Sequence, residues 1–450
     1  MDYQARLNRV IPGGAHTYSR GHDQFPSNAP QILERGEGAY VWDPDGKCYL
    51  DYGMALRAVT LGYANPRVND SAIRQIVKGN NLTRASTIEL EAAELFTQII
   101  PGAEMVKFAK NGSNATTAAA KIARAFTGKH FICIPRQHPF FSFDDWFIGT
   151  TALQKGIPNE HVSTTLVFEY NDIQSLRSLF DKYPGQIAGV MLEPSTTETP
   201  CTANCPELKA NPQCSACLCN ERNFLHQVQT LCKKESALFI LDEMITGFRW
   251  ALEGASSYFG VQPDLMTFGK GMANGFSVAA VTGRREVMEV GAIDKPEAER
   301  TFILSTTHGG EMLGLGAFIE TVKIYKTEDI CHHLWEFGAQ LKNQMNDLAT
   351  ELGIKDYFEV VGPAVSLNYI TKDSSGNASL DYRTLFAQEM IRNGVLMPWI
   401  AQSWSHGSSE LDQTLSAARN ALKIYRRALC DGLSGYLNYP SIKPVFRRFN

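Results

Sequence analysis

The stretch Thr267-Phe268-Gly269-Lys270-Gly271-Met272-Ala273-Asn274-Gly275 places one lysine among glycines and apolar residues. Partial desolvation in such a setting favours the neutral amine of a lysine, which is its nucleophilic form. Most lysines are instead solvated surface charges. The stretch alone therefore leaves Lys270 open to both interpretations.

An aspartate 28 positions earlier favours the catalytic interpretation. Asp242 follows the apolar run Phe239-Ile240-Leu241, which is typical of a buried strand. A lysine paired with an acid at a strand end suits an enzyme that uses pyridoxal 5'-phosphate (PLP). In such enzymes the lysine forms a Schiff base and the acid keeps the pyridinium nitrogen protonated. Lys270 and Asp242 are accordingly the predicted catalytic residues.

The length, the net charge and the apolar segments of the chain limit the class of protein. A chain of 450 residues exceeds what one hydrophobic core usually supports, so two or more lobes are expected. A net charge of −4 and a pI near 6.2 give no electrostatic reason to expect binding to nucleic acid or an acidic membrane surface. No apolar segment at the start resembles a secretory signal, and no run of about 18 apolar residues predicts a membrane span. A cytoplasmic protein is expected.

Short β-branched or apolar runs alternate with helical patterns from residue 131 to residue 282. This alternation predicts an α/β layer with a mostly parallel sheet, whose strand ends carry the site. After residue 310 the pattern indicates a long helix and then a smaller α+β domain. We expect residues 1–60 to join the small domain, 61–310 to form the large domain and 311–450 to complete the small one. The predicted strands are Phe131–Ile134, Thr165–Phe168, Ile187–Leu192, Ala237–Leu241, Met266–Phe268 and Val278–Thr282.

A second candidate site is the polar turn Asn111-Gly112-Ser113, between an apolar run from Met105 and an alanine-rich helical pattern. The N–H groups and the dipole at such a helix start can hold a phosphate. The same turn is also common as a purely structural feature. Lys270 is followed by Gly271 instead of Ser or Thr, so it does not complete a Walker motif, and no strict G-x-G-x-x-G occurs.

Taken together, these motifs resemble class III aminotransferases, which are PLP enzymes of fold type I, and among them the group that includes glutamate-1-semialdehyde aminomutase. The likeness extends from about residue 10 to about residue 430. Its most specific parts are Leu241-Asp242-Glu243-Met244-Ile245-Thr246-Gly247-Phe248-Arg249 and Phe268-Gly269-Lys270.

The resemblance implies a role for each part of the site. Lys270 would be the Schiff-base lysine, Asp242 the pyridinium partner, and Met244 would pack on one face of the cofactor ring. Asn111, Gly112 and Ser113 stand where the family has Ser-Gly-Thr and would hold the phosphate. Thr306, beside Thr307, matches a threonine that reaches the phosphate from the other subunit, so the resemblance also implies a homodimer.

Departures from the family pattern concern stacking and substrate. The family's aromatic-His-Gly turn is Phe140-Phe141-Ser142 here, and Phe140 can still stack on the ring because stacking needs only a flat apolar face. Arg57 stands where the aminomutases have the glycine of a Trp-Gly pair, and Arg20 matches a substrate-carboxylate position. An arginine offers a fixed fork to a carboxylate or to sugar hydroxyls, but either one could instead form a structural ion pair.

Variant motifs around residues 111–117, 270–276 and 306–311 resemble a sugar-modifying branch of the family. The reaction this implies is PLP-dependent transfer of an amino group from an amino acid to the carbonyl of a sugar or ulosonic acid. An enzyme that makes 8-amino-3,8-dideoxy-octulosonate for lipopolysaccharide is the nearest named type. Glutamate-1-semialdehyde 2,1-aminomutase is the alternative, and a non-catalytic regulator or scaffold with a PLP fold is the third. Release of a free 2-oxo acid from the donor separates transamination from aminomutation, and turnover with any donor excludes the scaffold.

Cysteines are concentrated in one insertion after Glu193-Pro194. Five lie within 19 residues, and thiolates two positions apart can bind one metal ion. Four of the five could close a structural zinc site, although the spacing matches no established pattern. Free thiols, or a disulfide formed on purification, are the alternatives. The cysteines concerned are Cys201, Cys205, Cys214, Cys217 and Cys219.

Overall fold

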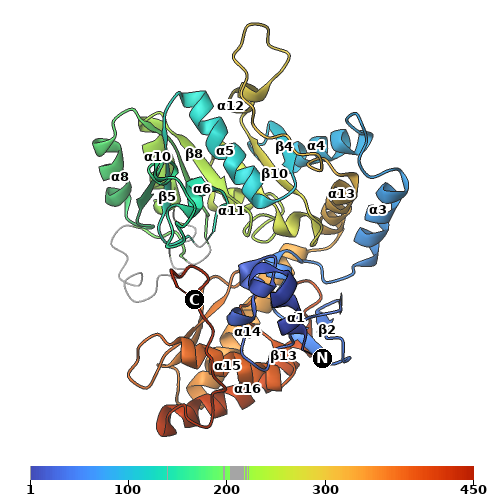
Figure 1. Cartoon of the computed structure of the whole chain (residues 1–450), viewed down its shortest axis with the longest axis vertical. Helices are drawn as coiled ribbons and strands as arrows, with labels where there is room; N and C mark the ends of the chain where they lie inside the picture. The colour runs from blue at the N-terminus through green and yellow to red at the C-terminus, as the bar shows by residue number, and fades with distance from the viewer. Residues whose placement is uncertain are drawn as a thin grey trace. The chain divides into compact units, whose positions relative to one another are not determined.

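The computed structural model describes residues 2–138, 140–195, 198–202, 217, 220 and 222–449. The chain divides into two compact units, of which the larger comprises Pro66–Cys331. The smaller unit combines Met1–Asn65 with His332–Asn450. Each unit has its own sheet and its own helices (Figure 1).

The larger unit is built on one sheet, with seven strands among the residues described, in the order β4-β10-β9-β8-β7-β5-β6. The strands from β9 to β6 are mutually parallel, whereas β10 runs antiparallel to both β9 and β4. This confirms the predicted α/β class with a mostly parallel sheet. The strands are β4 (Met105–Ala109), β5 (Phe131–Pro135), β6 (Thr165–Phe168), β7 (Ile187–Leu192), β8 (Leu238–Asp242), β9 (Leu265–Phe268) and β10 (Ala279–Gly283).

Helices α5 and α10 cover this sheet with their buried apolar faces. Helix α5 packs on β4, β7, β8, β9 and β10, and α10 packs on β7 and β8 (Figure 1). Strands β7 and β8 are buried along their whole length, as expected for strands covered on both faces. The helices are α3 (Pro66–Val77), α4 (Thr87–Ile99), α5 (Gly112–Thr127), α6 (Asp145–Ile148), α7 (Asn159–Val162), α8 (Ile173–Lys182), α10 (Phe224–Lys234), α11 (Ala255–Phe259), α12 (Arg285–Met288) and α13 (Met312–Thr327), with short 3-10 turns η4 (Lys270–Ala273) and η5 (Glu289–Gly291).

Two local signals in the sequence act as expected at helix starts. Ser86 and Glu89 form a capping box at the start of α4, in which the Glu89 carboxylate accepts the Ser86 N–H at 2.8 Å. The side chain of Asn111 caps α5 by accepting the N–H of Asn114 at 3.0 Å. The cap of α5 therefore lies in the predicted phosphate turn.

The smaller unit contains two sheets among its described residues, in the orders β1-β2-β3-β13 and β11-β12. Its longest helices, α14 and α16, pack their apolar faces into one core that includes Leu341, Phe386 and Tyr425. The elements are β1 (Arg35–Glu37), β2 (Tyr40–Trp42), β3 (Cys48–Asp51), β11 (Phe358–Val361), β12 (Asn368–Thr371), β13 (Val395–Leu396), α1 (Tyr3–Val10), α2 (Met54–Arg57), α14 (Ile330–Glu351), α15 (Leu380–Arg392), α16 (Ser408–Asp431), and the 3-10 turns η1 (Pro12–Gly14), η2 (Tyr18–Arg20) and η3 (His22–Gln24).

The larger unit ends at Cys331, whereas the predicted boundary of the large domain was residue 310. Helix α13 belongs to the larger unit because it packs on α3 and α4. In the described part of the chain, no helix is long and apolar enough to cross a membrane.

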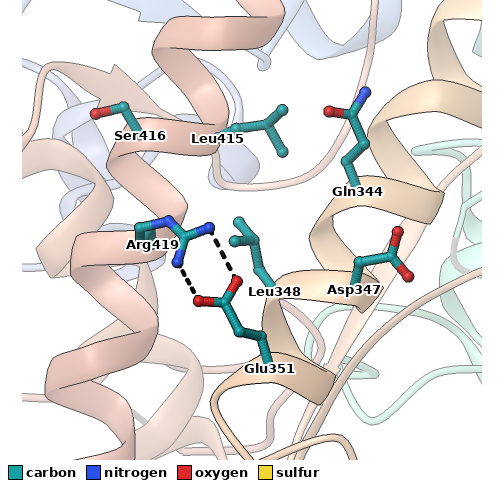
Figure 2. A pocket seen from close by; sticks show the side chains of 7 residues that line it. All are labelled: Gln344, Asp347, Leu348, Glu351, Leu415, Ser416 and Arg419. Atoms are coloured by element: carbon teal, nitrogen blue, oxygen red, sulfur yellow. Dashed lines mark hydrogen bonds and ion pairs between the residues drawn. The ribbon is translucent and has the colours of Figure 1, made fainter.

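A groove of about 430 Å³ lies between α14 and α16 of the smaller unit (Figure 2). The carboxylate of Glu351 accepts two hydrogen bonds from Arg419, at 2.6 and 3.0 Å, across one end of it. Neither residue belongs to the predicted site, and an ion pair this exposed contributes little to stability. The groove is lined by Gln344, Asp347, Leu348, Glu351, Leu415, Ser416 and Arg419.

Candidate active site

Asp242 ends the central strand β8 and is only 1% exposed. Its Oδ1 accepts the N–H of Met244 at 3.0 Å and the hydroxyl of Thr267 at 2.9 Å. Its Oδ2 is equally buried but has no hydrogen-bond partner among the residues described. Burial raises the pKa of Asp242 to about 6, and the positive charge of Lys270 opposes that rise. One carboxylate oxygen is thus fixed by the protein, and the other remains available for a donor.

Lys270 lies at the end of the neighbouring strand β9. Asp242 is paired in register with Thr267, three residues before Lys270. The two charged residues therefore lie at the carboxyl ends of neighbouring parallel strands. Lys270 has φ of +41°, a left-handed conformation that is unfavourable for a residue with a Cβ. Strain of this kind is retained mainly where the fold must fix a functional side chain.

Met244, two residues after Asp242, lies close to both the turn before Lys270 and the start of α5. A Cβ placed on Gly269 would lie 2.6 Å from Met244 Sδ, and one placed on Gly112 would lie 3.0 Å from the same atom. The turn before Lys270 and the start of α5 therefore both lie against this buried methionine. A side chain at either position would have to displace the methionine sulfur, because the backbone approaches it closely. The predicted residues Asp242, Met244, Gly112 and Lys270 are thereby brought together.

The predicted phosphate turn, residues 111–113, lies at the N-terminus of α5, a helix of 16 residues. Asn111 is its cap, and Gly112 and Ser113 form its first turn. The free N–H groups and the dipole of such a helix favour an anion. Ser113 is buried, and its Oγ accepts the N–H of Phe143 at 3.1 Å.

The loop that carries Phe140 is fixed to α5 by side-chain hydrogen bonds. Thr116 donates to the carbonyl of Phe141 at 2.8 Å, and the Oγ1 of Thr117 accepts the indole N–H of Trp146 at 2.8 Å. The ring of Phe140 meets Phe147 edge to face at 5.8 Å and is 45% exposed. The predicted stacking residue is thus on the loop next to the phosphate turn and retains an exposed surface.

Thr306 is exposed, in a turn that follows the long segment after η5. This turn is held near β4, because a Cβ on Gly309 would lie 3.4 Å from the carbonyl oxygen of Phe108. Glu311 forms an ion pair with Lys110 and accepts a hydrogen bond from Asn80 at 2.7 Å. Lys110 immediately precedes the phosphate turn, so the threonine turn is tied to the same region.

Two buried polar atoms that sequence reasoning missed lie at the ends of neighbouring strands. His138, after β5, accepts the N–H of Glu193 at its Nδ1 (3.0 Å), which leaves the hydrogen on Nε2. Burial lowers the pKa of His138 to about 3, so the ring is neutral. Its Nε2 and the Oγ of Ser195, after β7, have no partner among the described residues. The only signal in the sequence was their position three residues beyond a buried strand.

The other predicted residues lie elsewhere. Arg20 and Arg57 belong to the smaller unit, and their role in substrate binding stays a prediction. Cys201 is buried and donates its N–H to Asn171 Oδ1 at 2.9 Å, and Cys217 Sγ lies 3.2 Å from Thr202 Oγ1. Among the residues described, no group of three or more His, Cys, Asp or Glu side chains could hold a metal ion. The remaining predicted ligands, Cys205, Cys214 and Cys219, lie outside the described residues.

These residues fit PLP. The unpartnered Oδ2 of Asp242 can accept a hydrogen bond from a protonated ring nitrogen, and the start of α5 suits a phosphate. Lys270 supplies the amine at the neighbouring strand end. A mostly parallel sheet with a lysine, an acid and a phosphate turn at its strand ends defines a PLP-dependent enzyme of fold type I.

The comparisons identify the family. The family model "Aminotransferase class-III" matches residues 18–396, so the chain belongs to the class-III aminotransferases. It is 30% identical over 429 residues to a glutamate-1-semialdehyde 2,1-aminomutase of Acetivibrio thermocellus, covering 91% of this chain and 94% of the relative. It is 29% identical to the Alkaliphilus oremlandii protein of the same name, covering 95% of this chain and 99% of the relative.

A solved structure agrees with this assignment. The FumI protein of Sphingopyxis sp. MTA144, in its PLP internal aldimine form, superposes with a TM-score of 0.81 at 26% identity and 98% coverage of both chains. The prediction of a PLP-dependent aminotransferase of fold type I is confirmed. The more specific sugar or ulosonate branch is not confirmed by these relatives.

Proposed function

We propose that this chain transfers an amino group from an amino acid donor to the carbonyl carbon of a second small molecule. The observation that carries the proposal is the pairing of Lys270 with a buried Asp242 whose Oδ2 has no partner among the described residues. Bound PLP supplies an electron sink that makes the donor's Cα–H bond acidic.

Lys270 has two tasks in this reaction. With PLP bound, its Nζ would hold the aldehyde carbon of the cofactor until the amine of the donor takes its place. The released Nζ would then carry the proton from the donor's Cα to that same carbon. The strained backbone at φ +41° holds the lysine just beyond the carboxyl end of β9 for both steps.

Asp242 controls the charge of the ring nitrogen. With Oδ1 occupied by Met244 and Thr267, its Oδ2 is fixed in direction and can hold a proton on the nitrogen. Met244 contributes an apolar surface beside it, and Phe140 offers a ring for stacking. Asn111, Gly112 and Ser113 hold the phosphate through the start of α5.

The homodimer belongs to the same proposal. Thr306 is exposed in the single chain, and its turn is fixed by the pair of Glu311 and Lys110. A second copy could receive this hydroxyl at its own phosphate turn. The site of each copy would then need a residue from its partner.

The acceptor we propose is a sugar-like or ulosonic acid carbonyl, with formation of 8-amino-3,8-dideoxy-octulosonate as the candidate reaction. Its support is the set of variant motifs at residues 111–117, 270–276 and 306–311 together with Arg20 and Arg57. The second candidate is glutamate-1-semialdehyde 2,1-aminomutase, which is favoured by the names of the relatives at 29–30% identity. In both, an amino group reaches a carbonyl carbon of a substrate that carries a carboxylate.

The cysteine insertion is proposed to hold a structural metal. Its support is the sequence spacing, together with the short distance between Thr202 and Cys217 near its two ends. PLP carries the chemistry, so a metal here would stabilise the fold and would take no part in catalysis.

The test is a donor and acceptor screen on the purified enzyme. Amino acids are tested for bleaching of the cofactor absorbance, and carbonyl compounds are then tested for its recovery. Borohydride reduction should trap the cofactor on Lys270. The variant Lys270→Ala should lose both the adduct and turnover, whereas Lys107→Ala, an exposed lysine of β4, should keep both. Release of a free 2-oxo acid from the donor favours transamination, and its absence with turnover of glutamate-1-semialdehyde favours the aminomutase. Full turnover by Lys270→Ala would refute both the transaminase and the aminomutase proposals.

A further inference from the structure

Lys110 lies between β4 and the phosphate turn and is bonded to two further segments of the larger unit. Its Nζ forms an ion pair with Glu311, which ends the threonine turn, residues 306–311. Its carbonyl oxygen accepts a hydrogen bond from the hydroxyl of Ser277 at 2.7 Å. Ser277 ends the lysine loop, residues 270–277, and lies seven positions after Lys270. One residue therefore contacts the segments that carry the predicted phosphate, threonine and lysine groups.

A second set of hydrogen bonds fixes the threonine turn to the loop that follows α3. The side chain of Asn80 donates to Glu311 Oε1 at 2.7 Å and accepts the N–H of Leu313 at 3.0 Å. The side chain of Asn81 donates to the carbonyl oxygen of Thr307 at 2.9 Å. The ion pair uses Oε2, the other oxygen of Glu311. This carboxylate is thus held from two sides, and the end of the threonine turn is held with it.

The backbones of these segments also approach one another closely. A Cβ on Gly309, in the threonine turn, would lie 3.4 Å from the carbonyl oxygen of Phe108 in β4. A Cβ on Gly314, in the first turn of α13, would lie 3.0 Å from the carbonyl oxygen of Ser277. The threonine turn therefore lies against the strand before the phosphate turn, and the helix that follows it lies against the lysine loop. The ion pair is located where the three segments meet, so it can set their spacing.

The ion pair is poorly explained by stability alone. The side chain of Lys110 is 33% exposed and that of Glu311 is 16% exposed, and an ion pair in contact with solvent adds little to stability. The hydrogen bond from Lys110 lowers the pKa of Glu311, so the carboxylate is ionised at neutral pH. The two opposite charges lie beside a helix start that favours an anion. Because they compensate each other, we expect the pair to act on a bound phosphate through geometry.

We propose that Lys110 and Glu311 are positioning residues of the cofactor site. Their ion pair holds the threonine turn against the phosphate turn, and the carbonyl of Lys110 holds the lysine loop in the same place through Ser277. This inference rests on the proposed function and goes beyond it by assigning a task to two charged residues that do not themselves react. The spacing matters because a misplacement of about 1 Å can cost an enzyme about 100-fold in rate.

Two substitutions that break the ion pair have the same geometric effect but opposite electrostatic effects. Lys110→Met leaves a carboxylate unpaired beside the phosphate turn, whereas Glu311→Gln leaves an ammonium group there. If the pair acts through position, both variants should bind PLP about 10-fold more weakly in an equilibrium titration of the apoenzyme, as expected for loss of a charge-assisted hydrogen bond. If the pair acts through charge alone, Glu311→Gln should bind PLP more tightly than the wild type, and that result would overturn the proposal.

The matched control is another partly exposed ion pair of the same unit. Arg67 pairs with Glu320 at 2.8 Å and joins α3 to α13. Arg67→Met should keep the wild-type PLP affinity, because this pair contacts none of the three segments. The conservative variant Lys110→Arg should also keep it, since a guanidinium can pair with Glu311. Equal weakening by Arg67→Met would indicate a general loss of stability and would count against a positioning role.

Hydrogen exchange of the apoenzyme provides a measurement that does not depend on PLP. The N–H groups of residues 306–313 should exchange faster in Lys110→Met and Glu311→Gln than in the wild type, whereas those of β8 should not change. Unchanged exchange in the threonine turn would contradict the proposal. Borohydride reduction separates it from the proposed function. A wild type that forms no adduct on Lys270 would refute that function, whereas a normal adduct with wild-type PLP affinity in both variants would refute only the positioning role.

Discussion

The substitution Asp242→Asn separates the proposed catalytic role of this carboxylate from its role in the fold. An asparagine keeps Oδ1, which accepts the hydrogen bonds from Met244 and Thr267. Its amide nitrogen takes the place of Oδ2, the buried atom with no partner among the described residues. The local structure should therefore survive, while the negative charge that holds the ring nitrogen protonated is lost.

Loss of this charge should raise the stability of the apoenzyme and lower kcat/KM. The folded-state pKa of Asp242 is about 6, above the ordinary value of 3.8, so above pH 6 the buried charge lowers the stability of the apoenzyme. A difference of about two between these pKa values corresponds to about 3 kcal/mol, which sets the order of magnitude of the gain on neutralisation. The lost charge-assisted hydrogen bond to the ring costs about 2–4 kcal/mol in the transition state, or about 30- to 1000-fold in kcat/KM.

The assays are thermal unfolding of the apoenzyme at pH 8 and the rate of cofactor bleaching by a donor. We expect Asp242→Asn to raise the Tm of the apoenzyme and to slow bleaching severely. Unfolding of the same variant below pH 4 should show no gain, because Asp242 is then protonated in both states.

Glu243→Gln is the matched control, since Glu243 is the next residue and equally buried. Its oxygens accept the N–H groups of Ala255 at 2.7 Å and Ser256 at 2.6 Å, together with the hydroxyl of Thr246. A glutamine would turn an NH₂ donor toward one of these donors, so this variant should lose stability and keep the absorbance of its cofactor. An Asp242→Asn enzyme with wild-type kcat/KM, or with a lowered apoenzyme Tm at pH 8, would refute the reasoning.

Four further predictions follow from the same geometry. Gly269→Ala should weaken PLP binding about 10-fold in an equilibrium titration, because its Cβ would lie 2.6 Å from Met244 Sδ. PLP affinity should fall as the pH drops below about 6, because Asp242 must be ionised to hold the ring nitrogen; a flat profile from pH 5 to pH 8 would contradict this. If Thr306 acts in the partner's site, mixing Lys270→Ala with Thr306→Ala should restore activity that neither has alone, whereas no recovery would indicate action within one chain. Metal analysis of protein purified without chelators should find one equivalent of metal, lost on replacing the cysteines by serine, and its absence would exclude a site at Cys201, Cys205, Cys214, Cys217 and Cys219.

The sheet was predictable because its strands are short, buried runs bounded by helical patterns. Strands β6 and β7 begin and end at the residues predicted, and β8 is displaced by one residue at each end, so that it includes Asp242. The antiparallel direction of β10 was not predictable from its composition, because the pairing direction depends on the path of the connecting segments. Hydrophobic periodicity predicts which residues are buried but does not predict the direction of a strand.

The chemical groups of the site were predictable, but their supporting contacts were not. Lys270 and Asp242 stand out as a charged residue in an apolar stretch and an acid at a strand end. Gly112 approaches Met244 across more than 130 positions of sequence, and nothing local in the sequence predicts this contact. Residues 54–57 all have positive φ, and this left-handed backbone was also not predictable, because Met54, Ala55 and Leu56 are ordinary helix-forming residues whose propensity is overridden by tertiary contacts.

The proposed catalytic pair lowers the stability of the apoenzyme. Lys270 holds a backbone conformation that disfavours folding, and Asp242 carries a charge whose burial raises its pKa. Bound PLP would offset the second cost, since a protonated ring nitrogen near Oδ2 would compensate the buried charge. A ligand at 100 times its Kd stabilises the folded state by about 2.7 kcal/mol. In Asp242→Asn that cost is already absent and PLP binds more weakly, so the same PLP concentration should raise the Tm of this variant less than that of the wild type.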